Sequence, residues 1–186
     1  MKVESTIKAI VATMSEREKR QDEVLRLQRE VIRDCALAIR HLHTGQIKDA
    51  EKVAGDAEKK LDKVRKLDSD LKRNSAQCFQ EFVEVKSLLA LVQRKPVPSM
   101  EELDVDAVAY LNGLADTSGE LRRAMQIALG DGKRKEAQYY FDCLSELYDN
   151  LMLVKFSSSL VGPLKHKQDV VRSQVEQARS EMLRSS

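Results

Sequence analysis

Four carboxylates occur in two pairs, and each pair is spaced so that both acids project from one side of a helix. Glu81 and Glu84 are three residues apart, whereas Asp116 and Glu120 are four residues apart. Residues three or four apart are neighbours on a helical surface. If the two helices pack together, the pattern predicts a cluster of four acidic side chains.

The first pair lies within the apolar stripe of its own helix. At about 100° per residue, Glu81 projects from the middle of this stripe and Glu84 from its margin. The stripe itself consists of Val85, Leu88 and Val92. A buried carboxylate is costly unless it has a partner. A solvated face should not lie in a core stripe, so this pair is less easily explained as a surface feature.

A divalent cation is one partner that such a cluster would accept. Four carboxylates brought together repel one another and hold protons near neutral pH. A set of oxygen ligands without His or Cys favours Mg²⁺, with Mn²⁺ as an alternative. Such an ion suits phosphodiester cleavage, because it lowers the pKa of a water and stabilises charge on phosphoryl oxygens. The spacing alone also fits ordinary salt bridges or solvated faces.

Long helices separated by short breaks account for nearly the whole sequence. Charged residues make up 33% of the 186 residues, and there are only seven glycines and three prolines, a composition typical of helical bundles. No strand-like alternation or internal repeat is visible. The sequence predicts one all-α domain over residues 1–186, a bundle of six to seven helices. The main helices are expected at about 4–43, 46–72, 74–94, 105–129, 133–156 and 163–184.

Capping signals place the breaks between these helices. Gly45 is a plausible C-cap for the first helix, and Asn74 or Ser75 is a candidate N-cap for the third. Ser99 and Glu102 match a capping box ahead of the fourth helix.

Two glycines lie inside the helix that carries Asp116 and Glu120. Gly113 and Gly119 each cost about 1 kcal/mol relative to alanine in a helix interior. Such glycines indicate a close backbone approach or access for a ligand.

Charge and cysteine content narrow the class of protein. The net charge is only +2, so a nucleic-acid surface would have to come from local clustering. Three distant cysteines without a CxxC motif are expected to be small buried hydrophobes in a reducing compartment. The sequence contains no signal-peptide pattern and no apolar run of about 20 residues, which predicts a soluble cytoplasmic protein without a membrane span.

Basic residues recur along the first helix. Lys19, Arg26, Arg33 and Arg40 are seven residues apart, and Arg29 lies alongside. This line is about 30 Å long at 1.5 Å per residue and could follow a phosphate backbone. The alternative is a solvated face balanced by acids on the same helix.

Arg123 and the three histidines are the remaining candidate functional residues. Arg123 follows Glu120 by one turn and is either a phosphate clamp or a salt-bridge partner of the nearby acids. His41 and His43 point to different faces, which predicts surface or capping roles, and His166 is expected to face solvent.

Two segments resemble the translin family, and most closely its catalytic branch, translin-associated factor X. They are Phe79–Glu84 and Tyr110–Arg123. The second is similar to the family segment Tyr-Leu-x-Gly-x-Ala-Asp-x-x-Gly-Glu-Leu-x-Arg. A fainter likeness covers Leu27–Glu30, the His43 end of the first helix, Tyr148–Asp149 and Leu164–Gln168.

The resemblance implies an α-helical protomer that forms a closed, hollow homo-octamer around single-stranded RNA or single-stranded DNA. In the catalytic subunit of the family, four acids bind Mg²⁺ and cut RNA, and the non-catalytic subunit lacks the full set. The matching residues here are Glu81, Glu84, Asp116 and Glu120. With the resemblance, Arg26, Arg29, Arg33 and Arg123 become expected RNA contacts.

Three functions follow as hypotheses. The first is a metal-dependent endoribonuclease acting on single-stranded RNA. The second is a non-catalytic single-stranded RNA- or DNA-binding protein of the same architecture, which gives no reason to place four acids beside phosphates. The third is a structural helical bundle, which predicts that the acids pair with Lys or Arg and that the protein is a monomer or small dimer.

Overall fold

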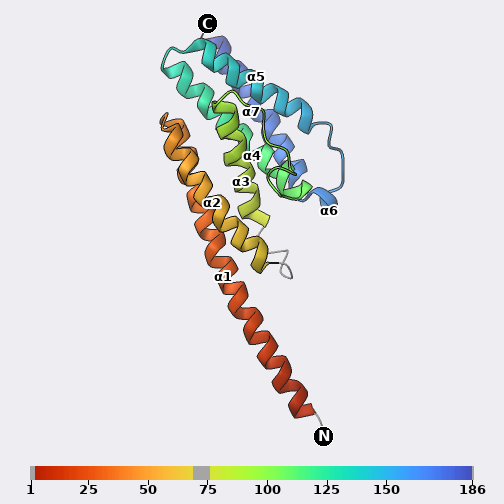
Figure 1. Ribbon diagram of the computed structural model, residues 1–186. Helices are drawn as coiled ribbons and strands as arrows, with labels where there is room; N and C mark the ends of the chain where they lie inside the picture. The colour runs from red at the N-terminus through yellow and green to blue at the C-terminus, as the bar shows by residue number, and fades with distance from the viewer. Residues whose placement is uncertain (1–2, 69–75, 186) are drawn as a thin grey trace.

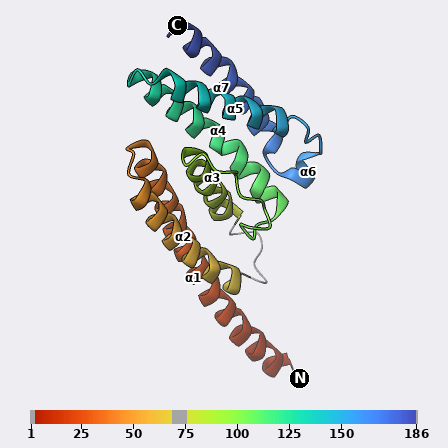
Figure 2. The same cartoon turned by 45° about the horizontal axis from the view of Figure 1, so that its top comes forward.

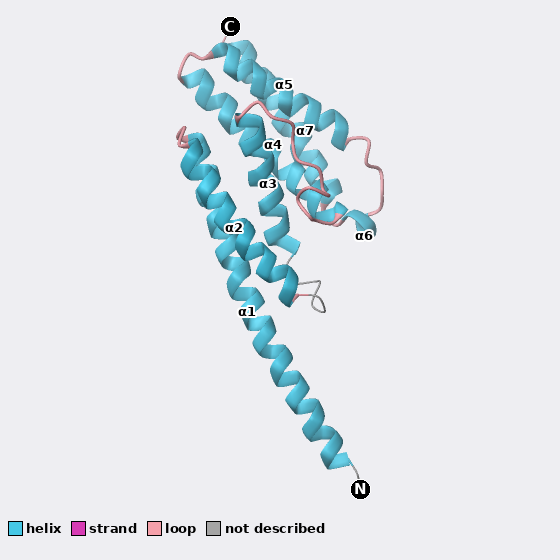
Figure 3. Ribbon diagram, in the orientation of Figure 1, coloured by secondary structure: helices cyan, strands magenta, loops and turns pink. Residues whose placement is uncertain are grey.

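The computed structural model describes residues 3–68 and 76–185, and these ranges contain helices and loops but no strand (Figure 3). The predicted all-α fold is confirmed. None of the described helices is both long and apolar enough to cross a membrane. Within the described ranges there are seven helices: α1 (Val3–His43), α2 (Ile47–Leu67), α3 (Ala76–Val92), α4 (Ala107–Gly130), α5 (Arg134–Leu151), α6 (Ser158–Val161) and α7 (Leu164–Arg184).

The helices are arranged around α3 and α4. α1 and α2 form a hairpin along one side of the molecule, and α3 packs against both (Figures 1 and 2). α4 packs against α3 on one side and against α5 and α7 on the other. The two helices that carry the acid pairs are therefore direct neighbours at the centre of the fold.

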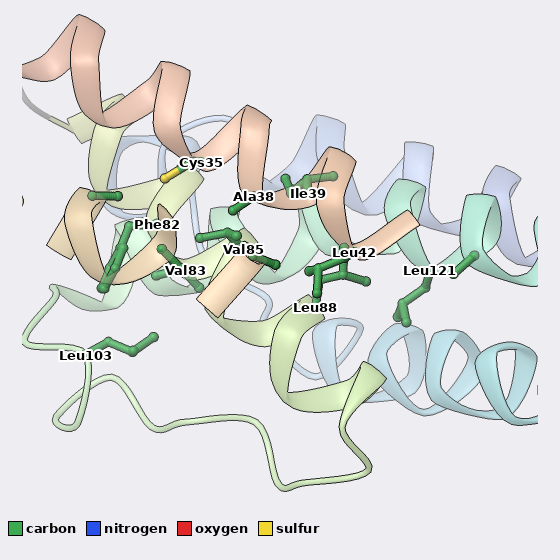
Figure 4. Close-up of a cluster of buried hydrophobic side chains, with 14 of the residues drawn as sticks. Cys35, Ala38, Ile39, Leu42, Phe82, Val83, Val85, Leu88, Leu103 and Leu121 are labelled. Carbon is green, nitrogen blue, oxygen red and sulfur yellow. The ribbon is translucent and has the colours of Figure 1, made fainter. Parts of the chain in front are cut away.

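The main core extends from α1 and α2 through α3 and α4 to α5 and α7, and Figure 4 shows the part between α1, α3 and α4. Phe82 and Leu88 of α3 and Leu121 of α4 are wholly buried in it. Each such side chain contributes about 1.5–3 kcal/mol when it leaves water. The α1 side chains that face this core recur at three- and four-residue intervals, namely Val24, Leu27, Val31, Cys35, Ala38 and Leu42.

A second, smaller cluster fixes the beginning of α7. Leu164 and Val171 of α7 pack with Ala115 of α4, Leu151 of α5 and Val161 of α6. This cluster holds the first turn of α7 against the part of α4 that carries Asp116.

Two helices end earlier than the sequence predicts. α2 ends at Leu67 rather than Lys72, and the predicted caps Asn74 and Ser75 lie outside the described residues. α5 ends at Leu151 rather than Phe156. There, Gln168 Nε2 of α7 donates to the carbonyls of Leu151 and Val154, at 2.7 and 2.9 Å, and so satisfies backbone groups that a longer helix would have used.

The capping box forms, but it does not begin the predicted helix. Ser99 N donates to Glu102 Oε2 at 2.7 Å, and Glu102 N donates to Ser99 Oγ at 3.2 Å. These bonds close an isolated turn. α4 begins later, at Ala107, with Asp106 Oδ1 accepting from Ala109 N at 2.8 Å. The predicted C-cap of α1 is confirmed by the positive φ of Gly45, +75°.

The first part of α1 extends away from the rest of the molecule (Figures 1 and 2). Residues 3–20 contain no buried side chain. Their large apolar residues are 47–57% exposed, namely Val3, Ile7, Ile10, Val11 and Met14. We call residues 3–20 the α1 arm.

Candidate metal centre

A close contact between α3 and α4 brings the two acid pairs together. A Cβ at Gly113 would lie 2.5 Å from the carbonyl oxygen of Gln80 and 2.6 Å from Cβ of Val83. Only glycine fits there without a shift of the backbone, which confirms the predicted close approach. Gln80 and Val83 each precede one acid of α3, so this contact sets the distance between the pairs.

Three of the four acids line one pocket with a volume of about 450 Å³. Glu81 and Glu84 enter it from α3, and Asp116 enters it from α4. Lys167 and the exposed His166, from the first turn of α7, line the same pocket. Gly119 is also part of the lining, and a Cβ there would meet no atom within 4 Å. Of the two roles expected for interior glycines, Gly119 thus fits access for a ligand.

The α3 acids are held in a setting that disfavours their charge. Glu84 is only 9% exposed, and burial raises its pKa to about 8, with further increases from Glu81, Asp116 and Glu120. The pKa of Glu81 is also raised, first by burial and then by Asp116. The structure therefore brings all four predicted acids into electrostatic contact, with Glu84 as the most affected group.

Each α4 acid instead contacts a basic group from another helix. Lys167 Nζ lies 2.5 Å from Asp116 Oδ2. His43 Nε2 lies 2.5 Å from Glu120 Oε2, with the ring N–H donating to the carboxylate. This hydrogen bond is the main reason that the pKa of Glu120 is lowered.

Lys167 and His43 are the site residues that motif analysis did not identify. The predicted surface or capping role of His43 is wrong, because its side chain is only 5% exposed and contacts Glu120. Both residues lie in segments with the fainter family likeness, which was the one signal available in the sequence.

The acids match a hard divalent cation in chemistry, although they do not converge on one point in this structure. Carboxylate oxygens are the ligands that Mg²⁺ and Mn²⁺ prefer, and Glu84 lacks a neutralising partner of its own among the described contacts. Across residues 3–68 and 76–185, no three acidic, His or Cys side chains converge closely enough to ligate one ion. In α4, Asp116 contacts Lys167 and Glu120 contacts His43.

The α1 arginines that were predicted to contact RNA lie at the surface, and they differ in their ion-pair partners. Arg26 pairs with Glu23 and Glu30 of its own helix, at 2.6 and 2.5 Å, which matches the solvated-face interpretation for that residue. Arg29 and Arg33 are exposed. At 100° per residue, Arg29 projects about 40° from the direction of His43, the α1 residue that contacts Glu120.

Arg123 fits both interpretations given for it. Its side chain is 59% exposed, and its Nη1 lies 4.0 Å from Glu120 Oε2. Such an exposed pair contributes little to stability and leaves the guanidinium accessible to a phosphate.

Known proteins are similar to this chain in sequence and in fold. It is 31% identical over 187 residues to an uncharacterized protein of Methanocaldococcus jannaschii, a match that covers 94% of this chain and 80% of that protein. No protein-family model matches it.

Two solved C3PO structures from Archaeoglobus, one of them a complex with duplex RNA, superpose with TM-scores of 0.85 and 0.87 at 27% identity. They cover 100% of this chain, which in turn covers 96–97% of theirs. Apo C3PO of Neurospora superposes with a TM-score of 0.84 at 22% identity, covering 97% of each chain.

Proposed function

This chain belongs to the translin family, as the C3PO proteins do, and from that premise we propose that it is a Mg²⁺-dependent endoribonuclease. Its proposed substrate is single-stranded RNA, with Mn²⁺ as an alternative ion and single-stranded DNA as a second ligand. The Archaeoglobus complex with duplex RNA supports RNA as the class of ligand.

The observation that carries this proposal is the pocket shared by the acids of α3 and α4. Glu81, Glu84 and Asp116 line it, and the charge of Glu120 raises the pKa of Glu84. A purely binding surface would gain nothing from four carboxylates, because they repel phosphate. A buried acid cluster is costly, and a bound cation offsets that cost.

In the proposed mechanism the four acids hold the ion and the arginines hold the RNA. Mg²⁺, when bound, would supply positive charge for the phosphoryl oxygens and make a water more acidic. Because Glu84 has a pKa of about 8, it would release its proton as the ion binds near neutral pH. Arg29, Arg33 and Arg123, all exposed, would bind backbone phosphates, with Arg26 as a further contact.

We also propose that the active protein is a closed homo-octamer. The exposed apolar side chains of the α1 arm and of the segment around α6 are surfaces that subunit contacts would cover; in the latter segment Leu153, Phe156 and Leu160 are 64–77% exposed. A closed shell would admit flexible single strands more readily than rigid folded RNA. Size-exclusion chromatography with light scattering tests this assembly, and a monomer would contradict it.

One observation favours a second candidate, a single-stranded RNA- or DNA-binding protein without chemistry. Asp116 and Glu120 already contact Lys167 and His43, so these two acids have partners without any ion. The same pairing of Asp116 meets an expectation of the structural-bundle hypothesis. Glu81 and Glu84 distinguish the hypotheses, because burial and neighbouring acids disfavour their ionised forms.

The test is cleavage of a labelled single-stranded RNA, beside a duplex of the same sequence. Reactions contain Mg²⁺, Mn²⁺ or EDTA, and compare the wild type with Glu84→Gln. Glu176→Gln serves as the control, because it removes a carboxylate from an exposed position on α7. We expect metal-dependent cleavage of the single strand that falls about a hundredfold or more in Glu84→Gln and is unchanged in the control.

Two other outcomes would change the conclusion. If the wild type binds the RNA but does not cut it with any metal, the binding-protein hypothesis replaces the nuclease. If the duplex is cut as fast as the single strand, the proposed substrate class is wrong.

A further inference from the structure

The ammonium group of Lys167 lies in a position built by both acid-bearing helices. Its Nζ is 2.5 Å from Asp116 Oδ2 and donates to the carbonyl oxygen of Asn112 and to Gln80 Oε1, each at 3.2 Å. Asn112 belongs to α4 and Gln80 to α3. The side chain is 20% exposed, so three oxygen acceptors replace most of the water around the charge.

The charge of Lys167 acts on the α3 acids as well. It lowers the pKa of both Glu81 and Glu84, against the stronger effect of burial. One ammonium group thus partly neutralises three carboxylates that line one pocket. This is the electrostatic task that a divalent cation would perform there.

Lys167 and a metal ion would compete for the same carboxylate. Mg²⁺ binds carboxylate oxygens at about 2.0–2.1 Å, and a second cation in contact with the same group is repelled. The long, flexible stem of lysine allows the ammonium to leave Asp116 without movement of α7. His166 and open volume in the pocket lie beside it.

We propose that Lys167 is an exchangeable internal counter-ion, which holds Asp116 until a divalent cation displaces it. This inference rests on the proposed function, because it takes Asp116 as a metal ligand. Lys167 is a positioning residue for Asp116, and it sets the metal concentration at which the site fills.

Two effects of removing the charge follow from competition. Lys167→Met should bind a divalent ion more tightly, since no ammonium has to be displaced. It should also be less stable than the wild type without metal, because Asp116 then faces the other acids without a partner. The increase in melting temperature on metal binding should therefore be larger in the variant.

The experiment measures Mn²⁺ affinity by electron paramagnetic resonance, without RNA, and melting temperature with and without saturating Mn²⁺. Lys165→Met is the matched control, because it removes the same charge from an exposed position two residues away. We expect Lys167→Met to bind Mn²⁺ about three- to tenfold more tightly, as for loss of one partly exposed opposing charge. Lys165→Met should stay within about twofold of the wild type, and Lys167→Arg, which keeps the charge, should resemble the wild type.

The outcomes separate this inference from the proposed function. If the wild type binds Mn²⁺ and Lys167→Met binds no more tightly than Lys165→Met, the inference fails alone. If the wild type binds no Mn²⁺, the metal-dependent function fails and the inference falls with it. Should Lys167→Met not fold, Lys167→Gln is compared in the wild-type and Asp116→Asn backgrounds, and an equal effect in both backgrounds overturns the competition.

Discussion

α3 and α4 present acids at the same one-turn spacing, yet the two pairs have opposite electrostatic surroundings. The α3 acids have raised pKa values, chiefly because they are buried. Each α4 acid contacts a basic side chain from a helix that is distant in the sequence, Lys167 for Asp116 and His43 for Glu120. Spacing along a helix decides that two acids share a face, whereas partners from elsewhere decide whether their charge is favourable.

The difference has a consequence for stability. An ionised Glu84 opposes folding, because its charge is more favourable in the unfolded chain, where it is hydrated. An ionised Glu120 favours folding, because its hydrogen bond to His43 stabilises the charged form. Replacing each glutamate by glutamine should therefore change stability in opposite directions.

The largest effect is expected at Glu84 as pH rises in the absence of divalent metal. Its folded-state pKa of about 8 exceeds the usual 4.5, so the folded protein keeps a proton that the unfolded chain has lost between these values. This contribution lowers the free energy of unfolding by about 1.4 kcal/mol per pH unit in that window. The Glu84→Gln variant lacks this pH-dependent loss. Its free energy of unfolding relative to the wild type should therefore rise by on the order of 3 kcal/mol from pH 5.5 to 8.

Urea unfolding in EDTA at both pH values measures this difference. Glu176→Gln, an exposed control, should track the wild type at each pH. A constant offset between Glu84→Gln and the wild type would show that Glu84 ionises normally.

The next effect concerns the helix contact that brings the two pairs together. Gly113→Ala should destabilise the fold by about 1–3 kcal/mol, because the new methyl group would overlap the backbone of α3 at Gln80. Gly119→Ala, on the same helix, meets nothing within 4 Å and should stabilise by up to about 1 kcal/mol. Thermal unfolding of the two variants provides the comparison. Equal shifts would mean that helix propensity, rather than the α3 contact, governs both sites.

Replacing Glu120 should change the free energy of unfolding in the direction opposite to replacing Glu84. At pH 8 in EDTA, Glu120→Gln should lower the free energy of unfolding by about 1 kcal/mol, because it weakens the hydrogen bond with His43. The lowered pKa means that this contribution is present above pH 4.5 and is lost as pH falls through the folded-state pKa. The same urea titrations measure it. A Glu120→Gln variant as stable as Glu84→Gln at pH 8 would remove the contrast between the helices.

The smallest effect is expected at the basic residues. Arg29→Gln should weaken binding of single-stranded RNA by about two- to fivefold. The slope of log affinity against log salt concentration should fall by about the amount expected for one lost phosphate contact. Arg26→Gln should do less, because Glu23 and Glu30 already engage that guanidinium. Fluorescence anisotropy at two salt concentrations, in EDTA to prevent cleavage, compares the variants. Equal losses would place both arginines on the RNA path.

Local rules were sufficient for part of this structure. The wheel pattern of α3 placed both acids in an apolar stripe, with Glu81 at its middle and Glu84 at its margin, but the structure buries Glu84 and leaves Glu81 partly exposed. The interior glycine at Gly113 correctly indicated a close backbone approach. Both inferences depend only on which residues share one face of one helix. The all-α fold followed from the same periodicity.

Contacts between residues far apart in the sequence could not be predicted from the pattern within one helix. Lys167 reaches Asp116 from 51 residues away, and His43 reaches Glu120 from 77. The end of α5 depends on the side chain of Gln168, which belongs to α7. The capping box of Ser99 and Glu102 follows its motif, but a motif does not determine whether a helix continues after its first turn.

The α1 arm is less stable locally than the rest of α1, which packs in the core. Its 18 residues, about 27 Å at 1.5 Å per residue, have no buried side chain, and an isolated helix of that length is marginal in water. Backbone amides of the arm should therefore exchange with solvent by local fraying, whereas those beyond Val24 exchange only when the core opens. Amide exchange along this single helix thus forms a gradient, and any contact that covers Val3 to Met14 would register as slowed exchange far from the acids.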